Sequence, residues 1–134
     1  MTLTREIIYS DDFPLKPHNA PAVKVPGLVF LAGQTATGEI KAATATALKN
    51  LAAVLELSGS SVDKIVKVNV WLQDMADFAA MNEVYIDVSG AKAKSRVAAL
   101  TNQFFPKPCP ARTCIQAGCL PGGSSIEIEA IAQV

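Results

Sequence analysis

Apolar and polar residues alternate in several short segments of the chain, a pattern typical of half-buried β-strands. The clearest segment is 64–72, where every second residue is predicted to point to the same side: Val66, Val68, Val70 and Leu72 to one side, and Ile65, Lys67, Asn69 and Trp71 to the other. We expect further strands at 4–9, at 112–118, at 125–132 and in both halves of 23–32, which the Pro26-Gly27 turn divides.

Helical spacing of apolar residues replaces this alternation in two places. Between residues 42 and 57, alanines and leucines recur on one face until Ser58-Gly59 ends the pattern. A second helix is expected at about 75–85, capped by Asp74, with Phe78, Met81 and Tyr85 on its apolar face. The order β-β-β-α-β-α-β-β predicts an α+β fold, a two-layer sandwich with both helices on one face of a mixed sheet.

The opposite face of this sheet is expected to be chemically mixed. If the helices cover Val66, Val68 and Val70, the other face carries Asn69 and Trp71. By the same alternation, the last two strands are expected to add Arg112, Cys114, Gln116, Glu127 and Glu129 to it. Such a face is either partly solvated or covered by other subunits, and we expect a homo-oligomer with clefts where the chains meet.

Composition points to one globular domain, residues 1–134, that handles small molecules. The 134 residues are 50% hydrophobic, which is ample for a core without disulfides or metals. Because 12 basic and 12 acidic residues cancel and neither sign forms a long block, a nucleic-acid or membrane-surface binder is disfavoured. Small metabolites are the better expectation.

The expected compartment is the cytoplasm. The first residues contain no apolar stretch long enough for a signal peptide or membrane span, and their acidic residues argue against a transit peptide. The three cysteines, at 109, 114 and 119, form neither an even set nor a CxxC pair, so they are expected to be reduced thiols. A mature mitochondrial form is the alternative.

Several segments, in the same order and spacing, resemble the RidA/YjgF/UK114 family of reactive-intermediate deaminases; they are 27–34, 47–55, 66–75, 78–85, 110–114 and 126–132. The resemblance implies a chorismate-mutase-like trimer with active sites between subunits. It also implies hydrolysis of enamine/imine intermediates, such as 2-iminopropanoate and 2-iminobutanoate, to 2-keto acids and ammonia without a metal or organic cofactor. Other members have been described as ribonucleases or translation inhibitors, so fold alone does not decide the function.

Two residues match the family's catalytic positions. Arg112, in Pro-Ala-Arg-Thr-Cys, matches the residue that binds the substrate carboxylate, and a planar guanidinium suits that task. The alternative is a structural arginine paired to Glu127 or Glu129 across neighbouring strands. Glu127 matches the position that orients the attacking water or assists its proton transfer.

Four further residues match positions that line the family's site: Gly33, Asn82, Cys114 and Asn19. Gly33 corresponds to a glycine whose backbone approaches the substrate, although relief of crowding at a strand end explains it nearly as well. Imine hydrolysis needs no covalent intermediate, so Cys114 is expected to act through its backbone N–H. Asn19 stands where the family commonly has a pocket tyrosine, which puts efficiency and substrate preference in doubt.

The chain also departs from the family by an additional segment at about 86–102, interpreted as a surface excursion or a lid at the cleft edge.

The sequence leaves three functions open. The first is the deaminase. The second is a non-catalytic metabolite-binding or regulatory trimer, which Asn19 favours. The third is a ribonuclease or translation inhibitor, which the zero net charge disfavours.

Overall fold

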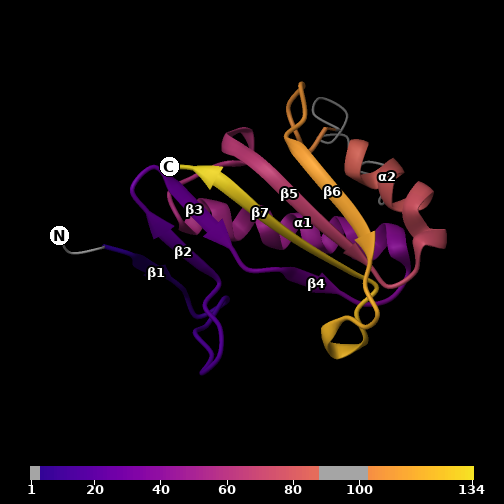
Figure 1. Cartoon of the computed structure of the whole chain (residues 1–134), viewed down its shortest axis with the longest axis horizontal. Helices are drawn as coiled ribbons and strands as arrows, with labels where there is room; N and C mark the ends of the chain where they lie inside the picture. The colour runs from indigo at the N-terminus through magenta and orange to yellow at the C-terminus, as the bar shows by residue number, and fades with distance from the viewer. Residues whose placement is uncertain (1–3, 88–102) are drawn as a thin grey trace.

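The computed structural model describes residues 4–87 and 103–134. The strands are β1 (Glu6–Ile8), β2 (Ala22–Val25), β3 (Leu28–Leu31), β4 (Gln34–Ala36), β5 (Ile65–Leu72), β6 (Ala111–Gln116) and β7 (Ile126–Gln133). They form one sheet in the order β1-β2-β3-β7-β5-β6, and β4 also pairs with β7 (Figure 1). Apart from residues 86 and 87, the additional segment at 86–102 lies outside the described residues.

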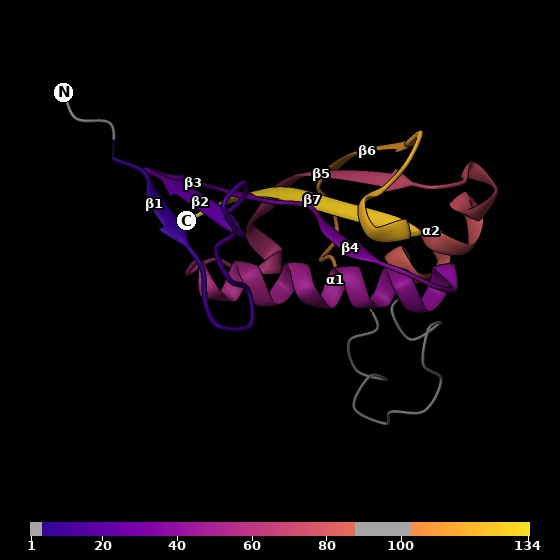
Figure 2. The same cartoon turned by 90° about the horizontal axis from the view of Figure 1, so that it is seen from below.

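Two α-helices, α1 (Ile40–Leu57) and α2 (Phe78–Ile86), pack on the same face of this sheet (Figure 2). The sheet is mixed, because β5 runs parallel to β6 and antiparallel to β7. The predicted α+β, chorismate-mutase-like sandwich is therefore confirmed.

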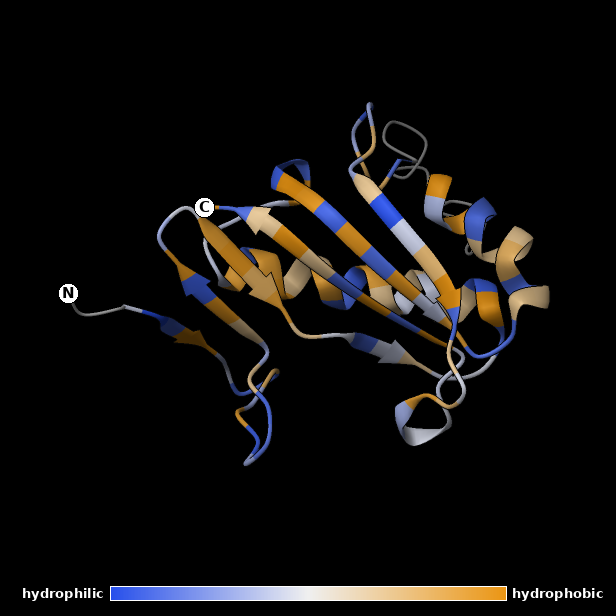
Figure 3. Cartoon of the chain, viewed as in Figure 1, coloured by the Kyte–Doolittle hydropathy of each residue, from blue (hydrophilic) through white to orange (hydrophobic). Residues whose placement is uncertain are grey.

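The core lies between α1 and the central strands. Leu48, Leu51 and Leu55 of α1 are fully buried, as are Val68 of β5 and Ile128 of β7. Burial of each such side chain contributes about 1.5–3 kcal/mol, so this layer stabilises the position of the central strands. Figure 3 shows the alternation along β5 and β7 as stripes of hydrophobic and hydrophilic residues.

Both helices begin differently from the expectation. Helix α1 starts two residues early, at Ile40, because the Glu39 carboxylate accepts hydrogen bonds from the backbone N–H groups of Lys41 and Ala42, both at 2.9 Å. Asp74 caps a short 3-10 turn, Met75–Asp77, by accepting from Ala76 N at 2.9 Å. The prediction that Asp74 caps the second helix itself is therefore wrong, since α2 begins only at Phe78.

Strand β5 carries a β-bulge near its start that the alternation did not reveal. The register with β7 shifts between Ile65 and Lys67. As a result Val66 is 43% exposed and Ile65 is buried, which reverses the prediction for these two residues. The short strand β4 was also missed, because its three residues carry no alternation that distinguishes them from a loop.

The register between strands decides which side chains share a face. Residues paired across neighbouring strands point to the same side, and Arg112, Cys114 and Gln116 of β6 pair with Val68, Val70 and Leu72 of β5. These three β6 residues therefore lie on the helix face, and the prediction that placed them on the open face is wrong. Glu127 and Glu129 pair with Trp71 and Asn69, so the prediction for the two glutamates is confirmed.

Candidate active site

Arg112 projects from β6 against helix α2. Its Nη1 donates a hydrogen bond to Asn82 Oδ1 at 2.7 Å and lies 3.9 Å from Met81 Sδ. The guanidinium carbon is 4.6 Å from the centroid of the Tyr85 ring, a cation–π distance. The alternative of a structural arginine paired to Glu127 or Glu129 is wrong, because both glutamates lie on the other face of the sheet.

Cys114 lies two residues beyond Arg112 on the same face and packs against the core. Partial burial raises the pKa of its thiol, and the nearby Arg112 charge only partly opposes this shift. These surroundings therefore favour the thiol over the thiolate. This agrees with the expectation that Cys114 is not an activated nucleophile.

Gly33 and Glu127 form a second cluster, on the open face. Gly33 lies between β3 and β4, and a Cβ atom added to it would come within 2.1 Å of Glu127 Oε1. Any larger residue at 33 would displace the carboxylate. Burial raises the pKa of the half-buried Glu127 carboxyl group, and the Glu129 charge raises it further. The carboxylate thus lies against bare backbone, in surroundings that favour proton uptake.

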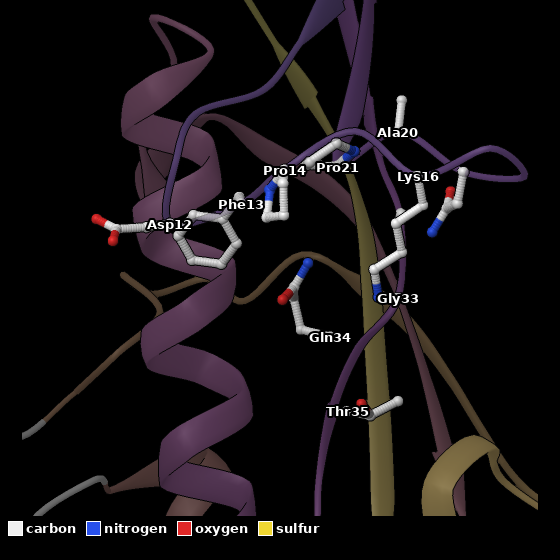
Figure 4. Close-up of a pocket in the computed structure, with 11 residues that line it drawn as sticks. Asp12, Phe13, Pro14, Lys16, Ala20, Pro21, Gly33, Gln34 and Thr35 are labelled. Carbon is white, nitrogen blue, oxygen red and sulfur yellow. The ribbon is translucent and has the colours of Figure 1, made fainter.

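A pocket of about 220 Å³ adjoins this cluster, and both Gly33 and Asn19 line it (Figure 4). Asn19 belongs to a tight turn closed by two backbone hydrogen bonds with Lys16, of 2.9 and 3.2 Å. Lys16 lines the same pocket, and its side chain extends from the turn toward the segment between β3 and β4 that contains Gly33. Asn19 thus lines a pocket beside Gly33, and its part in substrate binding stays a prediction.

The predicted site residues thus form two separate groups within one chain. Arg112, Asn82 and Cys114 lie together on the helix face. Glu127 lies on the open face beside Gly33, and Gly33 lines a pocket together with Asn19. Sequence reasoning missed the contact of Tyr85 with Arg112, although the spacing of Asn82 and Tyr85, three residues apart on a helix, was a usable signal.

Among residues 4–87 and 103–134, no group of histidine, cysteine, aspartate and glutamate side chains is arranged to hold a metal ion. In that same part of the chain, no helix has the length and apolar character needed to cross a lipid bilayer.

Comparisons with known proteins agree with this fold. Residues 11–134 match the family model described as endoribonuclease L-PSP. The protein mmf2, mitochondrial, of Schizosaccharomyces pombe is 43% identical over 126 residues, which cover 87% of this chain and 86% of the relative. Reactive Intermediate Deaminase A, chloroplastic, of Arabidopsis thaliana is 32% identical over 98% of this chain and 67% of its own length.

A solved structure gives the same result. The crystal structure of RidA from the Antarctic bacterium Psychrobacter superimposes with a TM-score of 0.77 at 30% identity, covering 96% of this chain and 99% of that one. Sequence and structure therefore show an α+β protein with the fold of the reactive-intermediate deaminases. The chain belongs to the RidA/YjgF/UK114 family.

Proposed function

We propose that this protein hydrolyses 2-imino acids, such as 2-iminopropanoate and 2-iminobutanoate, to 2-keto acids and ammonia at sites shared between the subunits of a homotrimer. The observation that carries the proposal is the placement of Arg112 and Glu127 on opposite faces of one sheet. A site that uses both side chains requires two chains, with Arg112 from one subunit and Glu127 from its neighbour.

The chemistry begins with the substrate carboxylate. In the described part of the chain, the hydrogen bonds of Arg112 leave only from Nη1, so its Nε and Nη2 donors are available as a planar edge. Such an edge binds a carboxylate through two parallel hydrogen bonds. Because the carboxylate is attached to C2, fixing it also fixes the carbon of the C=N bond.

Glu127 then handles the proton of the attacking water. Water adds to C2 as Glu127 accepts its proton, and the C=N π electrons move to nitrogen. Return of that proton to the nitrogen gives a carbinolamine. Its hydroxyl proton is then transferred to the nitrogen as the O–H electrons form the C=O bond and the C–N bond breaks, which gives the keto acid and ammonia. The raised pKa of Glu127 supports this shuttle, because a more basic carboxylate accepts a proton more readily. Cys114 supplies shape and its backbone N–H.

A non-catalytic metabolite-binding trimer is the second candidate, and Asn19 favours it. An asparagine in the pocket beside Gly33 lacks the ring and phenolic hydroxyl that the family commonly has there. This candidate predicts that the assembled protein binds keto acids without accelerating imine hydrolysis.

For the compartment, we keep the cytoplasm as the expectation from the sequence. Relatives named as mitochondrial and chloroplastic proteins make an organelle the competing location, and imaging of the tagged full-length protein decides between them.

The direct test couples a pyridoxal-phosphate dehydratase, which generates 2-iminopropanoate, to detection of pyruvate. We expect the wild-type protein to accelerate pyruvate release, whereas pyruvate binding without acceleration would favour the metabolite-binding trimer. Absence of both from a well-folded trimer would contradict the proposal.

The shared site has its own test, subunit mixing. Arg112→Ala and Glu127→Gln proteins, each inactive alone, are unfolded together and refolded as a mixture. If each site takes one residue from each of two chains, random assembly restores about a quarter of the sites. If both residues acted from the same chain, mixing would restore none, and the shared-site proposal would be wrong. Each variant refolded alone is the matched control.

A further inference from the structure

The side of α2 that faces Arg112 forms a cradle for its guanidinium group. Phe78, Asn82 and Tyr85 are spaced four and three residues apart, so they form one stripe on the helix. Asn82 accepts the hydrogen bond from Nη1, and the guanidinium carbon lies 4.6 Å from the Tyr85 ring centroid and 5.8 Å from that of Phe78. The cradle therefore combines one hydrogen bond with two aromatic surfaces.

The Tyr85 ring is itself held from behind. It is only 5% exposed and stacks on Phe105, with ring centroids 4.6 Å apart and planes tilted by 32°. Phe104 packs edge-on against Phe105 at 4.8 Å. These contacts join the end of α2 to the chain that precedes β6, so the ring under Arg112 has little freedom to move.

The hydroxyl group of Tyr85 does not account for this position. It is buried and has no hydrogen-bond partner among the described residues, an arrangement that lowers stability. Burial also raises the pKa of the phenol well above its usual range, more than the Arg112 charge lowers it. The neutral ring, and not the hydroxyl or a phenolate, is therefore the part that interacts with Arg112.

We infer that Tyr85 is a positioning residue, whose ring orients the Arg112 guanidinium so that its Nε–Nη2 edge is preorganised for the carboxylate of a 2-imino or 2-keto acid. The inference rests on the proposed function for its ligand class and on the cradle geometry for the orientation. A preorganised guanidinium loses less conformational freedom when the carboxylate binds, so the ring strengthens binding without touching the ligand. Asn82 fixes the rotation of the guanidinium, and the ring fixes its plane.

The test compares three variants of the assembled protein, with pyruvate as the probe ligand. Tyr85→Leu removes the ring but keeps an apolar side chain, and we expect it to weaken pyruvate binding about five- to thirtyfold. Tyr85→Phe keeps the ring, so binding should remain within about threefold of wild type and the melting temperature should be equal or higher. Val84→Ala, at a fully buried α2 position that makes no hydrogen bond or ring contact with Arg112 in the described part of the chain, is the matched control for destabilisation. It should lower the melting temperature without weakening binding.

A positioning role also predicts coupling between Tyr85 and Arg112. In an Arg112→Lys background, Tyr85→Leu should have much less effect on pyruvate binding than in the wild type, whereas a general packing role predicts equal effects. The NMR signal of the Arg112 Nε–H group, recorded without ligand, gives an independent readout. Its ring-current shift should be kept in Tyr85→Phe and strongly reduced in Tyr85→Leu, where only the more distant Phe78 ring remains.

The possible outcomes separate the two proposals. If the wild-type protein neither binds pyruvate nor hydrolyses the imine, the proposed function fails, and the Arg112 signal still decides whether the ring orients the guanidinium. If Tyr85→Leu leaves both the Arg112 signal and pyruvate binding unchanged, the inference about Tyr85 is overturned even in an active deaminase.

Discussion

The two halves of the proposed site, one around Arg112 and one around Glu127, are built by different physical means. Arg112 is held by side chains, through a hydrogen bond to Asn82 and the ring of Tyr85. Glu127 is accommodated by the lack of a side chain at Gly33, and its partial burial raises its pKa. A guanidinium keeps its charge in either setting, so its surroundings need only orient it. A carboxylate changes charge easily, so its surroundings also tune its chemistry.

The largest effect should come from removing the fixed charge. Arg112→Ala should lower the rate of 2-iminopropanoate hydrolysis about a hundredfold or more, on the order of 3 kcal/mol, because the substrate carboxylate loses its bidentate partner. Arg112→Lys keeps the charge but not the planar edge, so its hydrolysis rate should lie between those of the wild type and Arg112→Ala. Size-exclusion chromatography with light scattering checks assembly. Near-normal hydrolysis by a properly assembled Arg112→Ala protein would remove the deaminase assignment of this site.

The second-largest loss of activity should come from adding a side chain at Gly33. Gly33→Ala should lower activity about ten- to hundredfold, because the new Cβ forces the Glu127 carboxylate away from its place. Gly118→Ala is the matched control, since a Cβ there meets nothing within 4 Å. Activity is measured in the coupled assay and melting by calorimetry. Equal activity of the two variants would show that the exact position of Glu127 is unimportant.

A substitution at Cys114 tests whether the thiol beside Arg112 takes part in the reaction. Cys114→Ser keeps the backbone donor and approximate size, so hydrolysis should fall by less than about tenfold. Cys119→Ser, at an exposed cysteine, controls for general effects of losing a thiol. A loss of several orders of magnitude, or a covalent adduct on Cys114 detected by mass spectrometry, would contradict the mechanism.

The smallest effect should come from Glu129, which tunes the Glu127 half. In the proposed mechanism Glu127 acts as a carboxylate, so kcat/KM should fall as the pH drops through its raised pKa. Glu129→Gln removes a neighbouring negative charge, which lowers the pKa of Glu127 and moves this acid limb to lower pH. The amide oxygen still accepts the hydrogen bond that Asn69 Nδ2 donates to residue 129 at 2.8 Å. A pH–rate profile checks the direction, and an unchanged or opposite shift would contradict the role of Glu129.

Most of the fold was predictable because alternation and helical spacing are local signals. The bulge that exposes Val66 was not, because it depends on how β5 aligns with β7. The same limit explains the error for Arg112 and Cys114. Alternation tells which residues of one strand share a side, but only the pairing with β5 tells which side of the sheet that is.

The candidate site was predictable as a set of residues but not as an arrangement. The family motifs led to Arg112, Asn82, Gly33 and Glu127, each of which makes a specific contact in the structure. No sequence spacing reveals that Gly33 and Glu127 touch, since they are far apart in the chain. Tyr85 was predicted only as an apolar helix position, because sequence does not show which face of β6 meets α2.

The opposite placement of Arg112 and Glu127 has a consequence for cells that carry one normal and one defective copy of the gene. If the protein is the proposed homotrimer and each site takes one half from each of two chains, a subunit damaged in a single half inactivates one site of that trimer. Activity then falls in proportion to the share of defective subunits. A subunit damaged in both halves inactivates two sites, because it contributes one half to the site shared with each neighbour. Activity in such a mixture falls as the square of the fraction of normal subunits. With the same gene dose, damage to both halves therefore gives a dominant defect, whereas damage to one half gives a defect proportional to the fraction of defective subunits.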